Sequence, residues 1–182
     1  MKKILIILAE GFEEAEAVIP IDIFRRLGIE TVIAGLDDNF VTGSHGIVIK
    51  TDVLFENYSE LPDAVVFPGG MPGAENLANS TKVKSLISRM NSAKKLIAAI
   101  CASPALVLAP TGVLNAKTAT CYPGLEKNFS STIKFSEEKV VQDGNIITSR
   151  GAGTVFEFGL KIAENIVGKA KSDMTAQQML YP

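Results

Sequence analysis

Short uninterrupted apolar segments alternate with amphipathic ones along most of the chain. Four of these segments have the length and composition of strands buried on both faces: Lys3–Ala9, Thr31–Ala34, Ala64–Phe67 and Leu96–Ile100. Between them, apolar residues recur at helical spacing from Ala15 to Phe24 and from Val83 to Met90. This alternation predicts a layered α/β domain with a mostly parallel sheet.

Shorter segments predict antiparallel pairs beside this sheet. Phe40–Thr42 is expected to pair with Ile47–Ile49, and Val140–Thr148 alternates around Asp143-Gly144, a strong hairpin-turn signal. A final helix is predicted over Thr154–Val167, whereas the last fourteen residues carry little pattern. No repeat, low-complexity tract or linker divides the 182 residues, which fit one domain.

Charge and cysteine content narrow the possible partners. Eighteen basic and twenty acidic residues give a net charge of -2, which offers no excess for binding nucleic acid. The apolar run Ile4–Ala9 is too short for a membrane span and lacks a signal peptide's features, so a cytoplasmic location without a membrane partner is expected. Two cysteines and one histidine match neither a zinc site nor a disulfide framework, so no metal is expected.

Candidate chemistry lies at the carboxyl ends of two neighbouring predicted strands, where ligands bind in open parallel sheets. Cys101 follows the strand that ends at Ile100, and the small residues Ala99 and Ser103 flank it as in a nucleophile elbow. Backbone donors at a helix start favour the thiolate, so Cys101 is expected to be unusually acidic. From position alone, an inert buried thiol is an equal alternative.

Pro68-Gly69-Gly70 ends the other strand. Glycines there let backbone N–H groups approach a ligand, and with the N–H of Ala102 they would form an oxyanion hole beside the sulfur; an ordinary turn is the alternative. Upstream, Glu13 and Glu14 are interpreted as acids that complement the start of a helix. Spacing alone does not distinguish Glu16 from them.

Four motifs carry a resemblance to a known family. They are Ala-Glu-Gly-Phe-Glu-Glu-Ala-Glu at 9–16, Val-Phe-Pro-Gly-Gly at 66–70, Ala-Ala-Ile-Cys-Ala-Ser-Pro at 98–104 and Thr-Ser-Arg-Gly-Ala-Gly-Thr at 148–154. In this order and spacing, the chain resembles the DJ-1 branch of the DJ-1/PfpI (ThiJ) superfamily. The resemblance implies one domain over residues 1–182, with a core of about 3–168, folded as a flavodoxin-like or Rossmann-like α/β sandwich with a nucleophile elbow.

The resemblance also implies roles for individual residues. Cys101 matches the family's oxidisable nucleophile, and Glu16 matches the buried glutamate whose protonated carboxyl group hydrogen-bonds the sulfur. Gly70 and Ala102 match the backbone donors around that sulfur. The remaining candidates are Gly69, Cys121, Tyr122 and Arg150 as residues lining the site, and Arg26 and His45 as contacts of a homodimer.

The loop Cys121-Tyr122-Pro123 departs from the family pattern, which often has a histidine before the proline. Tyr122 stands there instead, and a phenol is a poor base near neutral pH. Cys121 would be a second thiol near the site in the family arrangement. A bystander cysteine is the slightly favoured interpretation.

Two functions would use these residues. The first is a cofactor-free enzyme of the glutathione-independent glyoxalase or deglycase type, in which Cys101 adds to the aldehyde of methylglyoxal and Glu16 moves the proton. The second is an oxidative-stress sensor or chaperone that forms a Cys101 sulfinate. A peptidase or amidotransferase is less expected because Ala102 stands where the peptidase branch has its histidine. No nucleotide-cradling loop supports a thiamine-pathway role.

Overall fold

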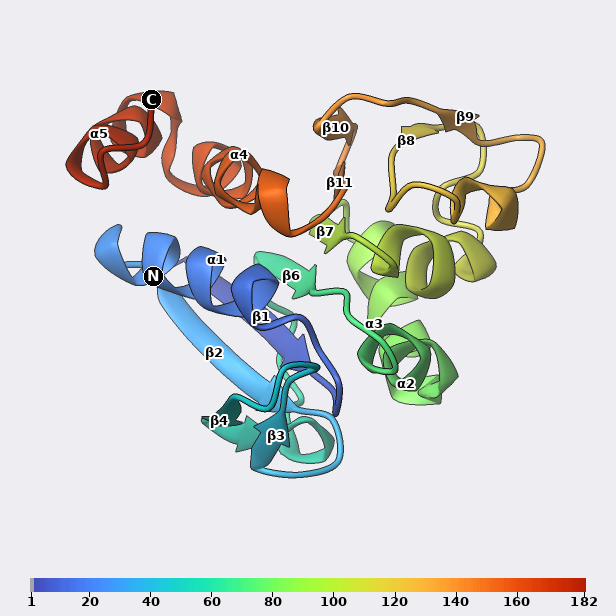
Figure 1. The fold of residues 1–182 in the computed structure, drawn as a ribbon, viewed down its shortest axis with the longest axis horizontal. Helices are drawn as coiled ribbons and strands as arrows, with labels where there is room; N and C mark the ends of the chain where they lie inside the picture. Colours follow the sequence, from blue (N-terminus) through green and yellow to red (C-terminus); the bar gives the residue numbers. More distant parts are fainter. Residues whose placement is uncertain (1) are drawn as a thin grey trace.

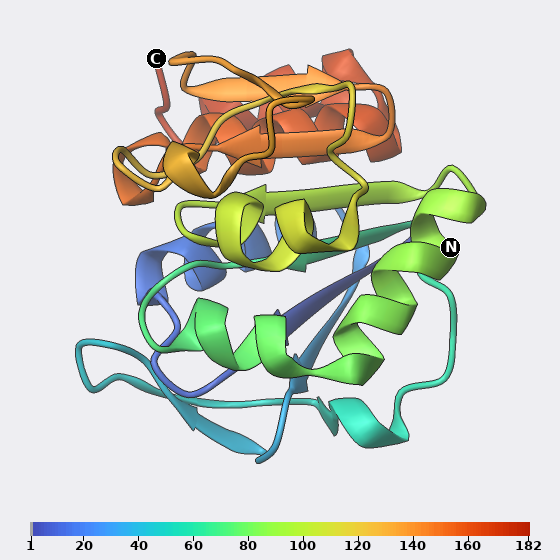
Figure 2. The ribbon, with the colours of Figure 1, turned by 90° about the vertical axis from the view of Figure 1, so that its right-hand side faces the viewer.

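A seven-stranded sheet forms the centre of the molecule, and helices cover both of its faces (Figures 1 and 2). The computed structural model describes residues 2–182. The strands, in spatial order, are β10 (Val140–Asp143), β11 (Ile146–Ser149), β7 (Leu96–Ile100), β6 (Ala64–Phe67), β1 (Lys3–Leu8), β2 (Glu30–Gly35) and β5 (Val53–Leu54). All neighbours are parallel except β10 and β11. The predicted α/β class with a mostly parallel sheet is confirmed.

The continuous apolar character of β1 follows from its place in the middle of this sheet. Ile4 and Ile6 face the core under α1 (Glu14–Arg26) and α4 (Val155–Val167). Leu5 and Ile7 face the opposite core. Because successive side chains of β1 point into two different apolar cores, none of its positions suits a polar side chain.

The opposite face is covered by α2 (Gly73–Asn79), α3 (Thr81–Ser92) and the short helix η2 (Pro104–Leu108), which lie together on the far side of the sheet from α1 in Figure 1. Two small sheets lie outside the main one, β3 (Phe40–Thr42) with β4 (Val48–Lys50) and β8 (Thr118–Ala119) with β9 (Lys134–Phe135). The remaining turns are η1 (Phe55–Asn57), η3 (Ala109–Thr111), η4 (Glu126–Asn128) and η5 (Ala152–Thr154).

The segment after Gly168 forms a helix that the sequence pattern did not indicate. This helix, α5 (Lys169–Gln178), packs against α4. Its buried residues are Ser172 and Thr175, and the Ser172 hydroxyl donates to the Leu160 carbonyl (2.9 Å). A helix that packs through small polar residues has no apolar stripe for a periodicity argument to detect.

Among the described residues, no helix has both the length and the apolar character required to cross a bilayer.

Candidate active site

Cys101 stands on a strained turn directly after β7. Its φ of 63° lies in the left-handed region, which is uncommon for a residue with a side chain. The Cys101 N–H donates to the Ser149 carbonyl (3.0 Å), and the Cys101 carbonyl accepts from the Tyr122 N–H (2.8 Å). The buried Ser103 hydroxyl donates to the Pro68 carbonyl (2.6 Å). Neighbouring strand ends therefore hold this turn in place, as expected of a nucleophile elbow.

Glu16 reaches the same turn from the first part of α1. Its side chain is 1% exposed, and Oε2 accepts a hydrogen bond from the Gly69 N–H (2.8 Å). The other oxygen, Oε1, is buried and makes no well-formed hydrogen bond within residues 2–182. A Cβ atom on Gly69 would lie 2.6 Å from Cys101 Cβ and 2.9 Å from Glu16 Oε2. Glycine at position 69 thus allows the carboxyl group and the thiol to approach each other.

The two groups compete for protons. Burial raises the pKa of Glu16 to about 7, against the opposing effects of the Gly69 N–H and the Cys101 thiol. Burial and the charge on Glu16 raise the pKa of Cys101 to about 12, although the N–H groups of Gly70 and Ala102 act to lower it. Near neutral pH, Glu16 is therefore about half ionised and Cys101 keeps its proton, so the one proton that the pair exchanges in this range is that of the carboxyl group.

The expectation of an unusually acidic Cys101 is therefore wrong for a charged Glu16. The helical turn itself starts directly after the thiol, since the Leu106 N–H donates to the Ala102 carbonyl (3.0 Å). The backbone donors at the helix start do lower the pKa of Cys101, but burial and the neighbouring carboxylate raise it by more.

A cavity of about 530 Å³ opens over the sulfur. Cys101, Gly70 and Ala102 line it together with Tyr122, whose side chain is 52% exposed. The remaining lining residues are Met71, Glu75, Leu106, Pro123, Gly124, Leu125 and Lys127. The residues predicted to lie together at the strand ends, Gly70, Cys101 and Ala102, are thus accessible from solvent through this cavity.

Two candidates for lining the site lie elsewhere. The Cys121 side chain is fully buried, and burial raises the pKa of its thiol to about 12. The Arg150 guanidinium donates to the Glu137 carbonyl (2.8 Å). Neither residue lines the cavity. The placement of Cys121 fits a bystander thiol, and the bond from Arg150 fits a structural role in the motif at 148–154.

Glu14 is buried and anchors the β3–β4 hairpin. From the sequence it was interpreted only as an acid at the start of a helix. Its Oε1 accepts from the N–H of His45 (2.7 Å), and its Oε2 lies 2.9 Å from His45 Nδ1. Burial would raise the pKa of Glu14, but its hydrogen bonds with the side chain and backbone of His45 and the backbone of Ile47 lower it to about 2. No signal in the sequence identifies this anchor, because its two halves lie 31 residues apart.

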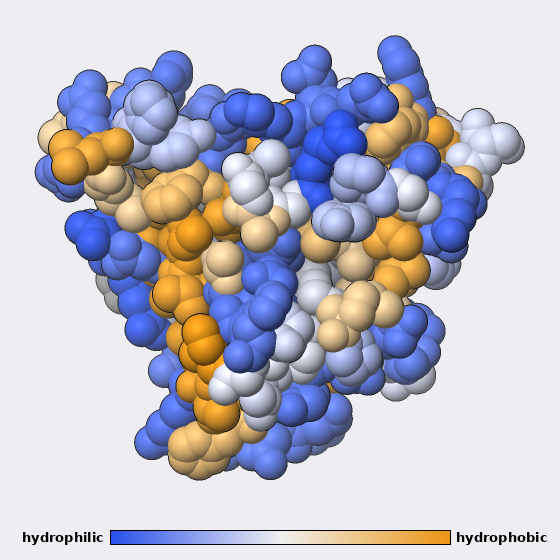
Figure 3. Space-filling view, in the orientation of Figure 1, coloured by the Kyte–Doolittle hydropathy of each residue, from blue (hydrophilic) through white to orange (hydrophobic). Residues whose placement is uncertain are grey.

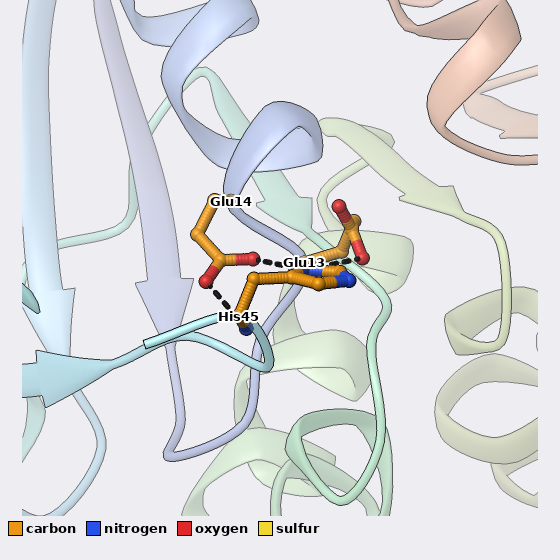
Figure 4. Close-up of side chains that lie close together, drawn as sticks. All are labelled: Glu13, Glu14 and His45. Atoms are coloured by element: carbon orange, nitrogen blue, oxygen red, sulfur yellow. Dashed lines mark hydrogen bonds and ion pairs between the residues drawn. The ribbon is translucent and has the colours of Figure 1, made fainter. Parts of the chain in front are cut away.

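Figure 4 shows the His45 ring between the carboxyl groups of Glu13 and Glu14. Within the described part of the chain, this is the one group whose ligand-type atoms would suit a metal ion, and they lie within 4.8 Å of one another. Glu14 already uses both oxygens in hydrogen bonds, which accounts for the cluster without a metal. Arg26, the other dimer-contact candidate, pairs with Asp22 at the far end of α1 (2.8 Å).

This chain is similar to known proteins over nearly its whole length. The DJ-1/PfpI family model matches residues 2–165. Protein dj-1beta of Drosophila melanogaster is 42% identical over 98% of this chain and 97% of its own length. A Caenorhabditis elegans protein named glutathione-independent glyoxalase DJR-1.2 is 33% identical over 94% and 92% of the two chains. The solved structure of oxidized Toxoplasma gondii DJ-1 aligns with a TM-score of 0.93 at 38% identity, over 100% of this chain and 99% of the other.

Proposed function

Because this chain belongs to the DJ-1/PfpI family, we propose that it is a cofactor-free enzyme that converts 2-oxoaldehydes such as methylglyoxal into 2-hydroxy acids through Cys101 and Glu16. The observation that carries the proposal is the meeting of a thiol and a buried carboxyl group across Gly69, at the floor of an open cavity. The glyoxalase name of the C. elegans relative supports the same chemistry. Deglycation of amine adducts would use the same residues.

Glu16 has the properties of a general base for this reaction. Its pKa of about 7 leaves much of it ionised near neutral pH, and a base acts best when its pKa lies close to the working pH. As Cys101 Sγ bonds to the aldehyde carbon, Glu16 accepts the thiol proton. The N–H groups of Gly70 and Ala102 stabilise the oxygen that becomes negative, before it receives that proton.

The remaining steps need no external oxidant. Glu16 carries the proton from the former aldehyde carbon to the neighbouring ketone carbon, and the hydroxyl proton on the first carbon's oxygen passes to the ketone oxygen. The first carbon is thereby oxidised to a thioester and the second is reduced to an alcohol. Water then cleaves the C–S bond and restores the thiol. The sum is one 2-oxoaldehyde and one water giving one 2-hydroxy acid.

A redox sensor or chaperone is the second candidate. Glu16 Oε1 is buried without a well-formed hydrogen bond, and two backbone donors act on the sulfur. A Cys101 sulfinate would raise the proton affinity of Glu16, so a protonated carboxyl group would donate to it. The relative solved in an oxidized form supports this alternative.

Lactate formation from methylglyoxal by the wild type, Cys101→Ser and Glu16→Gln tests the enzyme proposal. We expect turnover by the wild type, none by Cys101→Ser, and a loss of about 100-fold or more in Glu16→Gln, because an amide cannot accept the proton. Glu138→Gln, which changes an exposed carboxyl group, is the control and should retain full activity. A wild type without turnover would remove the enzyme proposal.

Intact mass after mild peroxide treatment tests the sensor candidate on the same variants. Glu16→Gln keeps a hydrogen-bond donor beside the sulfur, so we expect oxidation of Cys101 to the sulfinate to survive in this variant. Cys101→Ser should not gain the two oxygen atoms. If the wild type forms the Cys101 sulfinate but does not turn over methylglyoxal, the result supports the sensor function and contradicts the enzyme proposal.

We also propose a homodimer in the cytoplasm, where reducing conditions keep Cys101 free. An apolar stripe crosses α1 and continues onto the β3–β4 hairpin in Figure 3. Val18 and Ile47, which are 46% and 57% exposed, line a groove on this face together with His45. A second copy of the chain is the occupant that the family membership favours, and no nucleic acid or membrane partner is proposed.

A further inference from the structure

The cavity over Cys101 is larger than methylglyoxal requires. Its volume is about 530 Å³, within the range of sites that enclose drug-sized ligands. Methylglyoxal has five non-hydrogen atoms and would leave most of that space to water. The size of the cavity therefore points to a substrate with a bulkier substituent.

The walls of the cavity are mainly apolar. Leu106, Leu125 and Pro123 line it. Met71 and Tyr122 stand beside them with 48% and 52% of their side chains exposed, and both are among the few large hydrophobic side chains left open to solvent. Exposed apolar side chains grouped next to a nucleophile are the usual form of a ligand-binding wall.

Charge in the cavity does not favour an ionic substrate. Glu75 and Lys127 are the two charged lining residues, both are exposed, and their charges oppose each other. Binding a phosphate or carboxylate group usually takes several convergent positive charges or a bidentate arginine. The polar groups at the floor, in contrast, suit a neutral carbonyl oxygen.

We infer that the preferred substrate of this site is a neutral 2-oxoaldehyde whose substituent is apolar and larger than methyl. The inference rests on the proposed function and adds the substrate class to it. The aldehyde carbon lies at Sγ, and the substituent packs between Met71, Leu106 and Leu125. The reaction is the same, with one water added and a longer 2-hydroxy acid released.

The test compares methylglyoxal with 4-methyl-2-oxopentanal, which has the same reacting groups and three more carbon atoms. Each buried methylene group strengthens transition-state binding by a factor of several, so we expect kcat/KM for the larger aldehyde to be about 10-fold higher or more. Met71→Ser and Leu125→Ser should reduce this ratio by roughly 5-fold or more. Met174→Ser, an exposed methionine on α5, should leave both the ratio and the rates unchanged.

A binding measurement separates failure of this inference from failure of the proposed function. The unreactive ketone 4-methyl-2-pentanone should protect Cys101 from iodoacetamide at concentrations about 10-fold below those needed with acetone, whether or not any aldehyde turns over. If methylglyoxal is turned over and kcat/KM is about the same for the two aldehydes, the inference is overturned and the proposed function stands. Equal protection by the two ketones would overturn it even in a protein without turnover.

Discussion

The proton on Glu16 is the residue-scale feature on which the chemistry depends. A carboxyl group that is 1% exposed would be costly to ionise, and the single N–H bond from Gly69 offsets only part of that cost. The raised pKa is thus a property of the folded state. It follows that the group that serves as the proposed base also weakens the fold when it is charged.

Glu16→Gln should therefore change the pH dependence of stability. The pKa of Glu16 rises from 4.5 in the unfolded chain to about 7 in the folded one, so wild-type stability falls as the pH increases through this window. The full cost above pH 7 is about 3 kcal/mol. Urea unfolding at pH 5 and pH 8 should show Glu16→Gln gaining stability relative to the wild type at the higher pH. The same difference at both values would contradict a raised pKa.

The residues of the site differ in how well the sequence reveals them. Cys101 could be predicted because a small-residue segment after a buried strand is a local signal. Glu16 carries no local signal beyond the family resemblance, since its contact with Gly69 joins positions 53 residues apart. The direction of the Cys101 pKa shift depends on burial and on the Glu16 carboxylate, neither of which the sequence around Cys101 reveals.

The β3–β4 hairpin is held to the start of α1 by the buried Glu14 side chain and by backbone hydrogen bonds. Besides the Glu14 contacts, the Gly11 N–H donates to the Thr42 carbonyl (2.8 Å), and the Ser44 N–H donates to the Phe12 carbonyl (2.8 Å). A Cβ atom at Gly43 would overlap the Glu14 side chain, so the hairpin passes tightly over the start of α1. The hairpin and the beginning of α1 consequently behave as one unit.

Glu14→Ala should loosen this unit. The substitution leaves the N–H groups of His45 and Ile47 without their acceptor, which costs roughly 2 kcal/mol. Chemical denaturation at pH 7 measures the loss, with Glu138→Ala as the control for an exposed glutamate. Hydrogen exchange should also become faster over Phe40–Lys50. A stability change in Glu14→Ala no larger than that in the control would contradict the anchoring role.

Helices and strands could be predicted from the sequence where their buried residues recur at the helix or strand period. Apart from the two-residue edge strand β5, which was not predicted, the strands of the main sheet and helices α1, α3 and α4 match the predicted segments to within about two residues. Their apolar positions repeat at the strand or helix period. The two-residue strands β8 and β9 and the polar helix α5 have no such repeat. Their positions are fixed by contacts with distant segments.

At the scale of the whole molecule, the exposed stripe on α1 and the hairpin predicts self-association. Val18→Glu and Ile47→Glu would each bury a carboxylate in a dimer interface, so both should shift the protein to a monomer in light scattering after size-exclusion chromatography. Met174→Glu, which alters an equally exposed apolar residue on α5, should stay dimeric. A monomeric wild type, or dissociation in the Met174 variant as well, would argue against this interface.

The position of β1 in the interior of the sheet, between β6 and β2, has a consequence for synthesis on the ribosome. Among the strands of this sheet, β1 is made before the others and pairs with β2 almost at once. Its other edge waits for β6, and β7 and β11 must follow before that half of the sheet is complete. A nascent chain that ends before about residue 67 therefore carries an open, strongly apolar strand edge, the kind that recruits other chains. Chaperone binding during translation should concentrate on this stage and decline once Leu96–Ile100 has emerged.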